Sequence, residues 1–263
     1  MADGKQITNV YKLLSTIEES LDRIKAMPDS EAIHTMRVSF KQLRALLRVS
    51  GHYIVLKKKR VFKHFKKVYC AAGAVRDIDI YTGALQQYFT AVTIHIWKER
   101  QSGYTTHLQN ELQLAIAAFD IGKFTGVITH TMKHDVGQSE LREFIWQEIN
   151  SVAQELGKPL SDAAVHEIRK HYKDILYALP YLRKNGHNKE LRRKKKEVTA
   201  MAIRLGEYVD TCTKLIQLKR DLAEDLPAET IFILEKTQID WLLLKHRQKD
   251  KLTKKLSNAH IMD

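Results

Sequence analysis

The sequence predicts an all-α fold made of duplicated helical bundles, with about five helices in each repeat. Glycine and proline are scarce, with 11 and 4 among 263 residues. Apolar residues recur with a period near 3.6, which is typical of amphipathic helices. The third observation is a pattern of basic and apolar residues that appears twice, 132 positions apart, and this repetition favours an internal duplication.

Helical periodicity predicts ten helices, five on each side of a central segment. The expected ranges are 7–26, 31–50, 58–73, 76–89, 92–119, 139–156, 162–184, 188–205, 208–223 and 228–256. The segment 120–138 contains Gly122, Gly126 and Gly137, and we expect it to be the linker between the repeats. One domain of residues 1–263 would then contain repeats of about 1–120 and 139–263.

The helix starts support the duplication. Asp29 lies five residues before His34, and Ser161 lies five residues before His166. Aspartate and serine are favoured N-cap residues because their side-chain oxygens accept hydrogen bonds from the first free backbone N–H groups. We therefore expect a helix to begin after each of them.

Two predicted helices carry the same row of basic side chains. The first row is His34, Arg37, Lys41, Arg44 and Arg48, and the second is His166, Arg169 and Lys173. This spacing places the side chains of a row on one face of a helix, within an arc of about 80°. A row of this kind is most often a solvated helix face. Its repetition in register, on helices that also carry an apolar face, favours a binding function instead.

The helix after each row repeats a second basic pattern. Arg60 and Lys63 correspond to Arg193 and Lys196 at an offset of 133. Because they follow the two rows at matching places, we expect them to form a second wall of the same groove.

A glycine and an aspartate end each unit of the pattern. These are Gly73 with Asp77 and Gly206 with Asp210. We expect a boundary between helices near each glycine. The aspartates are expected to cap a helix or to hold an arginine.

Charge and side-chain chemistry point to an anionic partner. The net charge is +13 and the isoelectric point is near 9.6, which favours nucleic acid, an anionic membrane or a phosphate polymer. Arginine donates paired hydrogen bonds to phosphate oxygens, lysine adds a point charge, and histidine donates from its ring nitrogens.

These motifs resemble the signature of the CHAD domain, the conserved histidine α-helical domain family. The resemblance rests on a doubled His-x-x-Arg-x-x-x-Lys followed by Gly-x-x-x-Asp, within residues 33–44 and 73–79 and again within 165–173 and 205–210. It implies two pseudo-symmetric helical bundles around a basic central cavity that binds inorganic polyphosphate. It also implies association with polyphosphate granules in bacteria.

The resemblance assigns a cavity-facing role to seven residues. They are His34, Arg37, Lys41, Arg44, His166, Arg169 and Lys173. We expect further contacts from Arg48, Arg60, Lys63, Lys170, Arg193 and Lys196. The second row departs from the pattern, because Leu176 replaces the second arginine and Pro180 interrupts the helix. A symmetric binding mode is therefore not expected.

Other functions are less favoured. An RNA- or DNA-binding module is the main alternative, since the same rows would contact backbone phosphates, but base-reading or stacking residues are not evident among them. The sequence contains no motif typical of a phosphohydrolase, so we expect no enzyme activity, cofactor or metal. His130 and His134 lack a third ligand nearby. With two cysteines and no signal peptide, a cytoplasmic protein without membrane attachment is expected.

Overall fold

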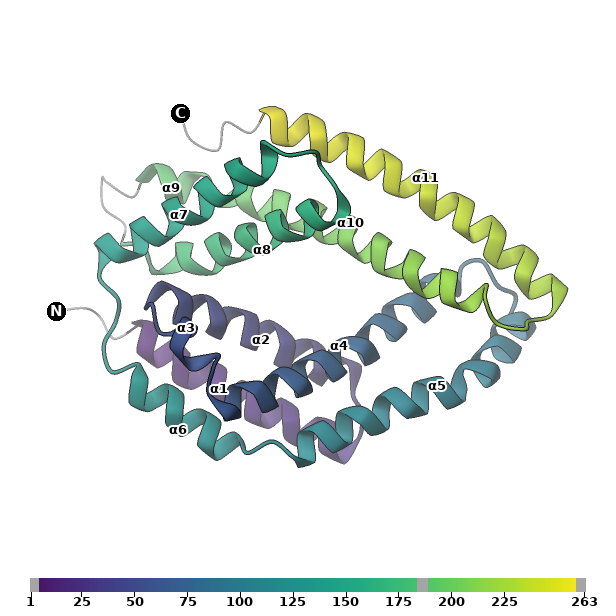
Figure 1. Cartoon of the computed structure of the whole chain (residues 1–263), viewed down its shortest axis with the longest axis horizontal. Coiled ribbons are helices and arrows are strands. Elements are labelled where there is room, and N and C mark those ends of the chain that lie inside the picture. The colour runs from purple at the N-terminus through teal and green to yellow at the C-terminus, as the bar shows by residue number, and fades with distance from the viewer. Residues whose placement is uncertain (1–4, 184–188, 259–263) are drawn as a thin grey trace. The chain divides into compact units, whose positions relative to one another are not determined.

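The computed structural model describes residues 5–183 and 189–258, and every regular element within them is helical, as predicted (Figure 1). The first helices are α1 (Lys5–Ala26), α2 (Ser30–Val49), α3 (Tyr53–Leu56), α4 (Arg60–Leu85), α5 (Ala91–Ala117) and α6 (Ile121–Thr131). They are followed by α7 (Gln138–Leu156), α8 (Asp162–Ala178), the 3₁₀ turn η1 (Leu179–Tyr181), α9 (Lys189–Arg193), α10 (Lys195–Asp221) and α11 (Ala228–Asn258).

The predicted starts of α2 and α8 are confirmed. A carboxylate oxygen of Asp29 accepts a hydrogen bond from the backbone N–H of Glu31 at 2.9 Å. The hydroxyl of Ser161 accepts one from the N–H of Ala164 at 3.1 Å. Each cap therefore satisfies a backbone donor that has no partner within its helix.

Two predicted helix boundaries are wrong. Helix α4 continues through Gly73, and α10 continues through Gly206, where breaks were expected between 73 and 76 and between 205 and 208. A glycine inside a helix costs only about 1 kcal/mol relative to alanine. Buried side chains on both sides of each glycine, such as Ala72 and Val75 around Gly73, offset this cost by packing.

Much of the predicted linker, segment 120–138, is helical, because α6 occupies it. Asp120 caps this helix by accepting a hydrogen bond from the backbone N–H of Lys123 at 2.8 Å. Phe124 and Ile128 are fully buried in the surrounding core. The glycines suggested a loop, but the apolar spacing from 124 to 128 is sufficient to hold a helix against the core.

The predicted helix 162–184 ends earlier than expected. Helix α8 stops at Ala178, and the chain continues as the turn η1, which contains Pro180. Proline lacks the backbone N–H that a continuing helix requires. Residues 184–188, where this helix was to end and the next to begin, lie outside the described part.

The chain forms two compact units. Unit 1 takes in the described residues of 1–76, 103–145 and 177–192, and unit 2 takes in those of 77–102, 146–176 and 193–263. Since α4, α5 and α7 contribute residues to both units, the units do not coincide with the predicted sequence repeats, and the internal repeat stays a prediction.

Unit 1 is built on α1 and α2, which pack along each other through their apolar faces. A group of phenylalanine rings joins them to the other helices of the unit. The ring centroids of Phe40 and Phe65 lie 4.4 Å apart, and those of Phe65 and Phe124 lie 4.7 Å apart. This core fixes α2 and α4 side by side.

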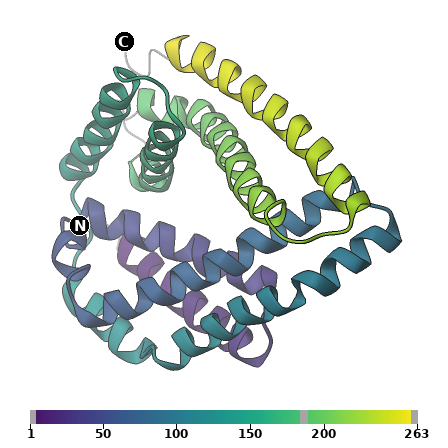
Figure 2. The ribbon, with the colours of Figure 1, turned by 45° about the vertical axis from the view of Figure 1, so that its right-hand side comes forward.

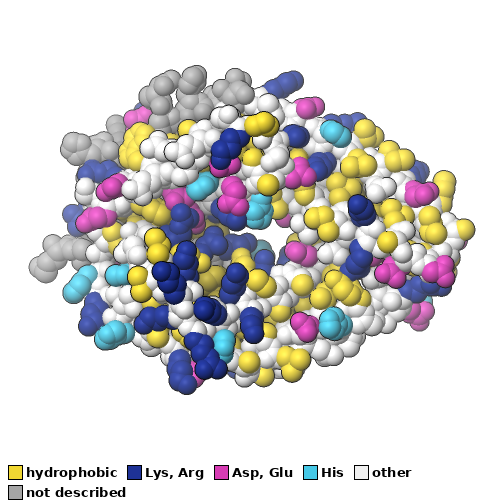
Figure 3. Space-filling model, viewed as in Figure 1, with side chains coloured by type: hydrophobic (Ala, Val, Ile, Leu, Met, Phe, Trp, Pro, Cys, Tyr) yellow, Lys and Arg dark blue, Asp and Glu magenta, His cyan; other side chains and the backbone are white. Residues whose placement is uncertain are grey.

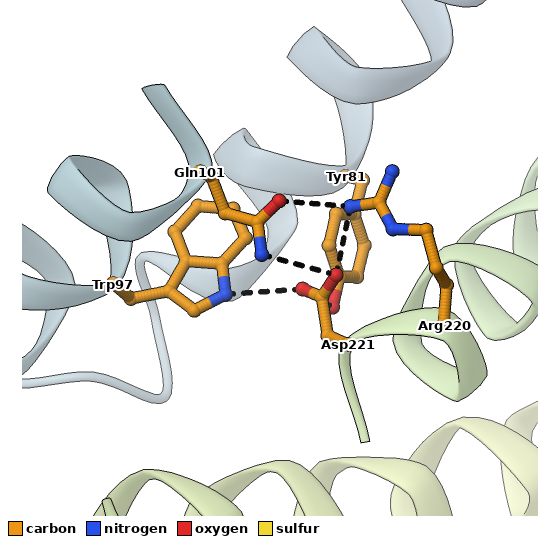
Figure 4. A network of polar contacts seen from close by, with 5 residues as sticks. All are labelled: Tyr81, Trp97, Gln101, Arg220 and Asp221. Atoms are coloured by element: carbon orange, nitrogen blue, oxygen red, sulfur yellow. Dashed lines mark hydrogen bonds and ion pairs between the residues drawn. The ribbon is translucent and has the colours of Figure 1, made fainter. Parts of the chain in front are cut away.

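Unit 2 contains the packed pair α10 and α11 (Figure 2). Its core surrounds the carboxylate of Asp221, which is fully buried (Figure 4). That carboxylate accepts hydrogen bonds from the Tyr81 hydroxyl at 2.8 Å, the Trp97 indole N–H at 3.0 Å and the Gln101 amide at 3.4 Å, and it pairs with Arg220 at 2.8 Å. Burial and the Asp221 carboxylate raise the pKa of Tyr81 above its usual value, so this hydroxyl keeps its proton.

No single helix in the described residues is both long and apolar enough to cross a membrane. The pair α5 and α6 meets the requirement together but is bent by 59°. In this pair Leu112, Ile116, Phe124 and Ile128 are buried in the core of unit 1.

Candidate functional site

The first basic row lies along α2 beside its apolar face. Ile33, Met36, Leu43 and Leu47 are fully buried in the core of unit 1. The basic row follows the same helix on the adjoining face. Figure 3 shows Lys and Arg side chains gathered over the region of unit 1 where Figure 1 draws α2, α3 and the start of α4. His34 is exposed, whereas the four other members are half-buried: Arg37, Lys41, Arg44 and Arg48. The sequence therefore predicted both faces of α2.

Arg37 is held in place by α4. Its Nη1 donates a hydrogen bond to the backbone carbonyl of Tyr69 at 2.6 Å, and its guanidinium lies 4.3 Å from the centroid of the Tyr69 ring. The backbone of Gly73 lies directly beside it, since a Cβ added there would be 2.6 Å from Nη1. A side chain at this position would displace the guanidinium of Arg37 from its contacts with α4.

Unit 2 repeats this pairing of arginine and glycine. Arg169 of α8 lies beside Gly206 of α10, where an added Cβ would be 3.7 Å from Nε of the arginine. This contact is looser than the one in unit 1. The Nε of Arg169 is buried and has no hydrogen-bond partner among the described residues. Each row therefore sets one arginine against a glycine of a later helix.

Sequence reasoning missed this contact. Gly73 and Gly206 were predicted only as boundaries between helices. Their spacing from the arginines of the two rows nevertheless repeats. The arginine precedes its glycine by 36 residues in the first half and by 37 in the second. The pattern showed that the two positions correspond, but not that they touch.

Lys173, in the second row, has a pKa below its usual value. Burial lowers the pKa of this half-buried amine, and the nearby charge of Arg169 lowers it further. The carboxylate of Asp210 acts in the opposite direction, on Lys173 and on Lys214. Asp210 was expected to cap a helix or hold an arginine, and the structure instead places it within α10 with its charge acting on lysines.

Beside the half-buried Arg169 and Lys173, α8 carries two further predicted site residues. His166 is exposed, and Lys170 forms an ion pair with Glu167 at 2.7 Å. An exposed pair of this kind contributes at most about 1 kcal/mol, so an anionic ligand is able to compete for the lysine. The row does not extend past Lys173, because Leu176 follows and α8 ends before Pro180.

Two predicted members of the site lie apart from the side of α4 that meets Arg37. Arg60 precedes Tyr69 by nine residues, which places it about 180° around the helix axis, and Lys63 is about 120° away. Arg60 instead lines a cavity formed with α6. Arg193 at the end of α9 and Lys196 at the start of α10 are both exposed.

At the other end of the first row, Arg48 contacts α7. Its guanidinium lies 5.5 Å from the centroid of the Phe144 ring, within unit 1. Among the described residues, no group of three or more His, Cys, Asp or Glu side chains is placed to hold a metal ion.

Comparison with known proteins gives the family. The family model for the CHAD domain matches residues 10–219, from α1 to near the end of α10. The chain belongs to the CHAD domain family. The CHAD fold of this chain is further supported by its similarity to a solved structure, the crystal structure of the CHAD domain from the plant Ricinus communis. The match has a TM-score of 0.74 at 15% sequence identity, and it covers 94% of this chain and 89% of the plant domain. At this identity the likeness shows the fold alone. No curated protein matches the chain.

Proposed function

We propose that this CHAD chain binds inorganic polyphosphate along the basic faces of α2 and α8, without chemically altering it. The observation that carries the proposal is that each unit sets a row of cationic side chains along one helix and seats one arginine of the row against a glycine. Other phosphate-rich polyanions share the same chemistry.

The geometry favours a linear polyanion over a nucleic acid. A polyphosphate chain carries charge at short intervals and has no bases, so cationic donors are sufficient to bind it. A protein that binds single strands also needs exposed aromatic rings for stacking. Three tyrosines lie near the rows in sequence: Tyr53 and Tyr181 pack against the apolar core of unit 1, and Tyr177 is half-buried.

Partly fixed side chains strengthen such binding. The hydrogen bond from Arg37 to the Tyr69 carbonyl and the contact with Gly73 hold this arginine before a ligand arrives. Binding then costs less side-chain entropy than it would for freely rotating arginines.

The direct test is titration of the purified protein with long-chain polyphosphate, using the double variant Lys41→Ala/Lys173→Ala. A hydrogen bond to a charged group contributes about 1.5–3 kcal/mol, so removal of two lysines is expected to weaken binding at least about tenfold. The matched control is Lys12→Ala/Lys98→Ala, which removes the same charge from exposed positions on α1 and α5. Equal affinities of the two double variants would contradict the proposal.

A second pair of substitutions tests the seated arginines. Arg37→Ala/Arg169→Ala is expected to reduce affinity sharply. Because Arg37 also bonds to α4, the unfolding temperature of this variant must be measured first. Unchanged affinity in the folded double variant would count against a role for the two rows.

The absence of catalysis and the cellular role belong to the same proposal. Incubation of the protein with polyphosphate is expected to release no orthophosphate, and release above the level of buffer alone would overturn the non-enzymatic part.

We further propose a cytoplasmic location on polyphosphate granules. A fluorescent fusion that fails to co-localise with granules while binding polyphosphate in vitro would contradict this.

A further inference from the structure

Unit 1 contains a cavity that the two basic rows do not use. It lies between the start of α4 and one face of α6, and its volume is about 850 Å³. Small-molecule pockets commonly span about 300–1,000 Å³, whereas a single phosphate ion fills only a small part of such a space. The volume of the cavity therefore fits a ligand that is larger than a single phosphate ion.

The rim of the cavity is strongly basic. Lys59, Arg60 and His64 line it from the α4 side, and Lys123 and His130 line it from α6. Across the described residues, no carboxylate lies within ion-pair distance of Arg60, His64 or His130. The positive charge of this rim is thus largely uncompensated, which favours an anion.

Asp120 is the only acid among the lining residues of this cavity, and it is already engaged. Its carboxylate accepts a hydrogen bond from the backbone N–H of Lys123 as the cap of α6, and it pairs with the Lys123 amine at 3.2 Å. These contacts lower its pKa. It neutralises one lysine and leaves the remaining cationic groups for a ligand.

The rest of the lining is apolar or small. Val61 and Val127 contribute side chains that pack against the core of unit 1, and Ala118 and Gly126 complete this part. A Cβ added at Gly126 would meet no atom within 4 Å, so the space beside this glycine is open. An apolar wall next to a cationic rim suits an organic group that carries phosphates better than a bare phosphate chain.

We propose that this cavity is a second anion site, separate from the α2 row, which binds a small organic phosphate of about nucleotide size. Arg60 lies about 180° around α4 from the side that holds Arg37, so one phosphate group cannot contact both arginines through that helix. The proposal adds His64 and Lys123, which the sequence pattern did not single out, to Lys59, Arg60 and His130.

The test uses ATP and inorganic tripolyphosphate as probes, in the absence of divalent metal, with calorimetric titration of the full chain. Gly126→Leu fills the open space without removing any charge, and leucine is a better helix former than glycine. Gly103→Leu on α5 is the matched control, because its added Cβ also meets no atom within 4 Å and it does not line the cavity. His64→Gln/His130→Gln removes the cationic capacity of two rim residues.

ATP is expected to bind the wild-type protein and to bind Gly126→Leu and the double glutamine variant at least tenfold more weakly. Gly103→Leu and Lys41→Ala/Lys173→Ala are expected to retain ATP affinity, and tripolyphosphate is expected to bind at least tenfold more weakly than ATP. Failure of ATP to bind, unchanged binding in Gly126→Leu, equal binding of tripolyphosphate, or loss of binding only in the lysine variant would each overturn the proposal. Long-chain polyphosphate binding by Gly126→Leu is expected to be unchanged, so this result stays distinct from the test of the two rows.

Discussion

Replacement of Gly73 by alanine is the sharpest test of how the first basic row is held. The new Cβ would lie 2.6 Å from Nη1 of Arg37, which is closer than van der Waals contact allows. The arginine must therefore move away from α4. It would lose its hydrogen bond to the Tyr69 carbonyl and its contact with the Tyr69 ring.

The magnitude follows from these contacts. A hydrogen bond from a charged donor contributes about 1.5–3 kcal/mol, and a cation–π contact at a partly exposed site contributes about 0.5–1 kcal/mol. Alanine offsets about 1 kcal/mol of this loss because it favours the helix more than glycine does. We expect Gly73→Ala to reduce the free energy of unfolding by about 1–3 kcal/mol.

Alanine at two other glycines is expected to raise the free energy of unfolding instead of lowering it, so these two variants serve as controls. A Cβ at Gly206 would be 3.7 Å from Nε of Arg169, an ordinary contact, and a Cβ at Gly83 would meet nothing within 4 Å. Both lie inside helices, so alanine at either position is expected to stabilise the protein by about 0.5–1 kcal/mol. Urea denaturation of the three variants measures the effect, and Gly73→Ala as stable as Gly83→Ala would refute the reasoning.

Three further substitutions follow from unit 2. Asp221→Ala removes a fully buried carboxylate and leaves its donors unpaired, so we expect the free energy of unfolding, measured by urea denaturation, to fall by about 3–5 kcal/mol. The control Asp225→Ala, at an exposed position, should change it by no more than about 0.5 kcal/mol. Equal effects of the two substitutions would contradict this assignment. Ser161→Ala removes the cap of α8 and should cost about 1 kcal/mol in the same assay, whereas no loss would mean that the cap is unimportant. Folding disfavours the charged form of Lys173, whose pKa is lowered, so this penalty is present below the folded pKa and disappears as pH rises to the usual lysine value. Lys173→Met should therefore raise the melting temperature at pH 7, lose this advantage at alkaline pH and weaken polyphosphate binding. A lower melting temperature of the variant at pH 7 would contradict the expected direction of the stability change.

Local signals predicted much of the fold. The helical class and the starts of α2 and α8 depend on residues close in sequence, such as the caps Asp29 and Ser161. The boundaries at Gly73 and Gly206 were predicted wrongly because the packing that overrides a glycine comes from distant helices. The same limitation hid α6, whose Phe124 is buried against two rings of α4.

The candidate site shows the same division. Periodicity placed the basic residues of α2 beside its apolar face, as the structure has them. Periodicity did not indicate that Arg37 lies against Gly73, since a side-chain contact across 36 residues has no local signature. The network around Asp221 was missed for this reason too, because Tyr81 and Trp97 precede it by more than 120 residues.

The measurement that tests the central claim most directly is a competition between long-chain polyphosphate and RNA, matched in phosphate concentration, at low salt and at about 0.15 M salt. The account predicts that polyphosphate displaces RNA at far lower phosphate concentration than the reverse, and that its binding persists at the higher salt and depends on Lys41 and Lys173. Equal binding of both polymers, abolished by salt and insensitive to these lysines, would mean a generic basic surface and would contradict a polyphosphate site on α2 and α8.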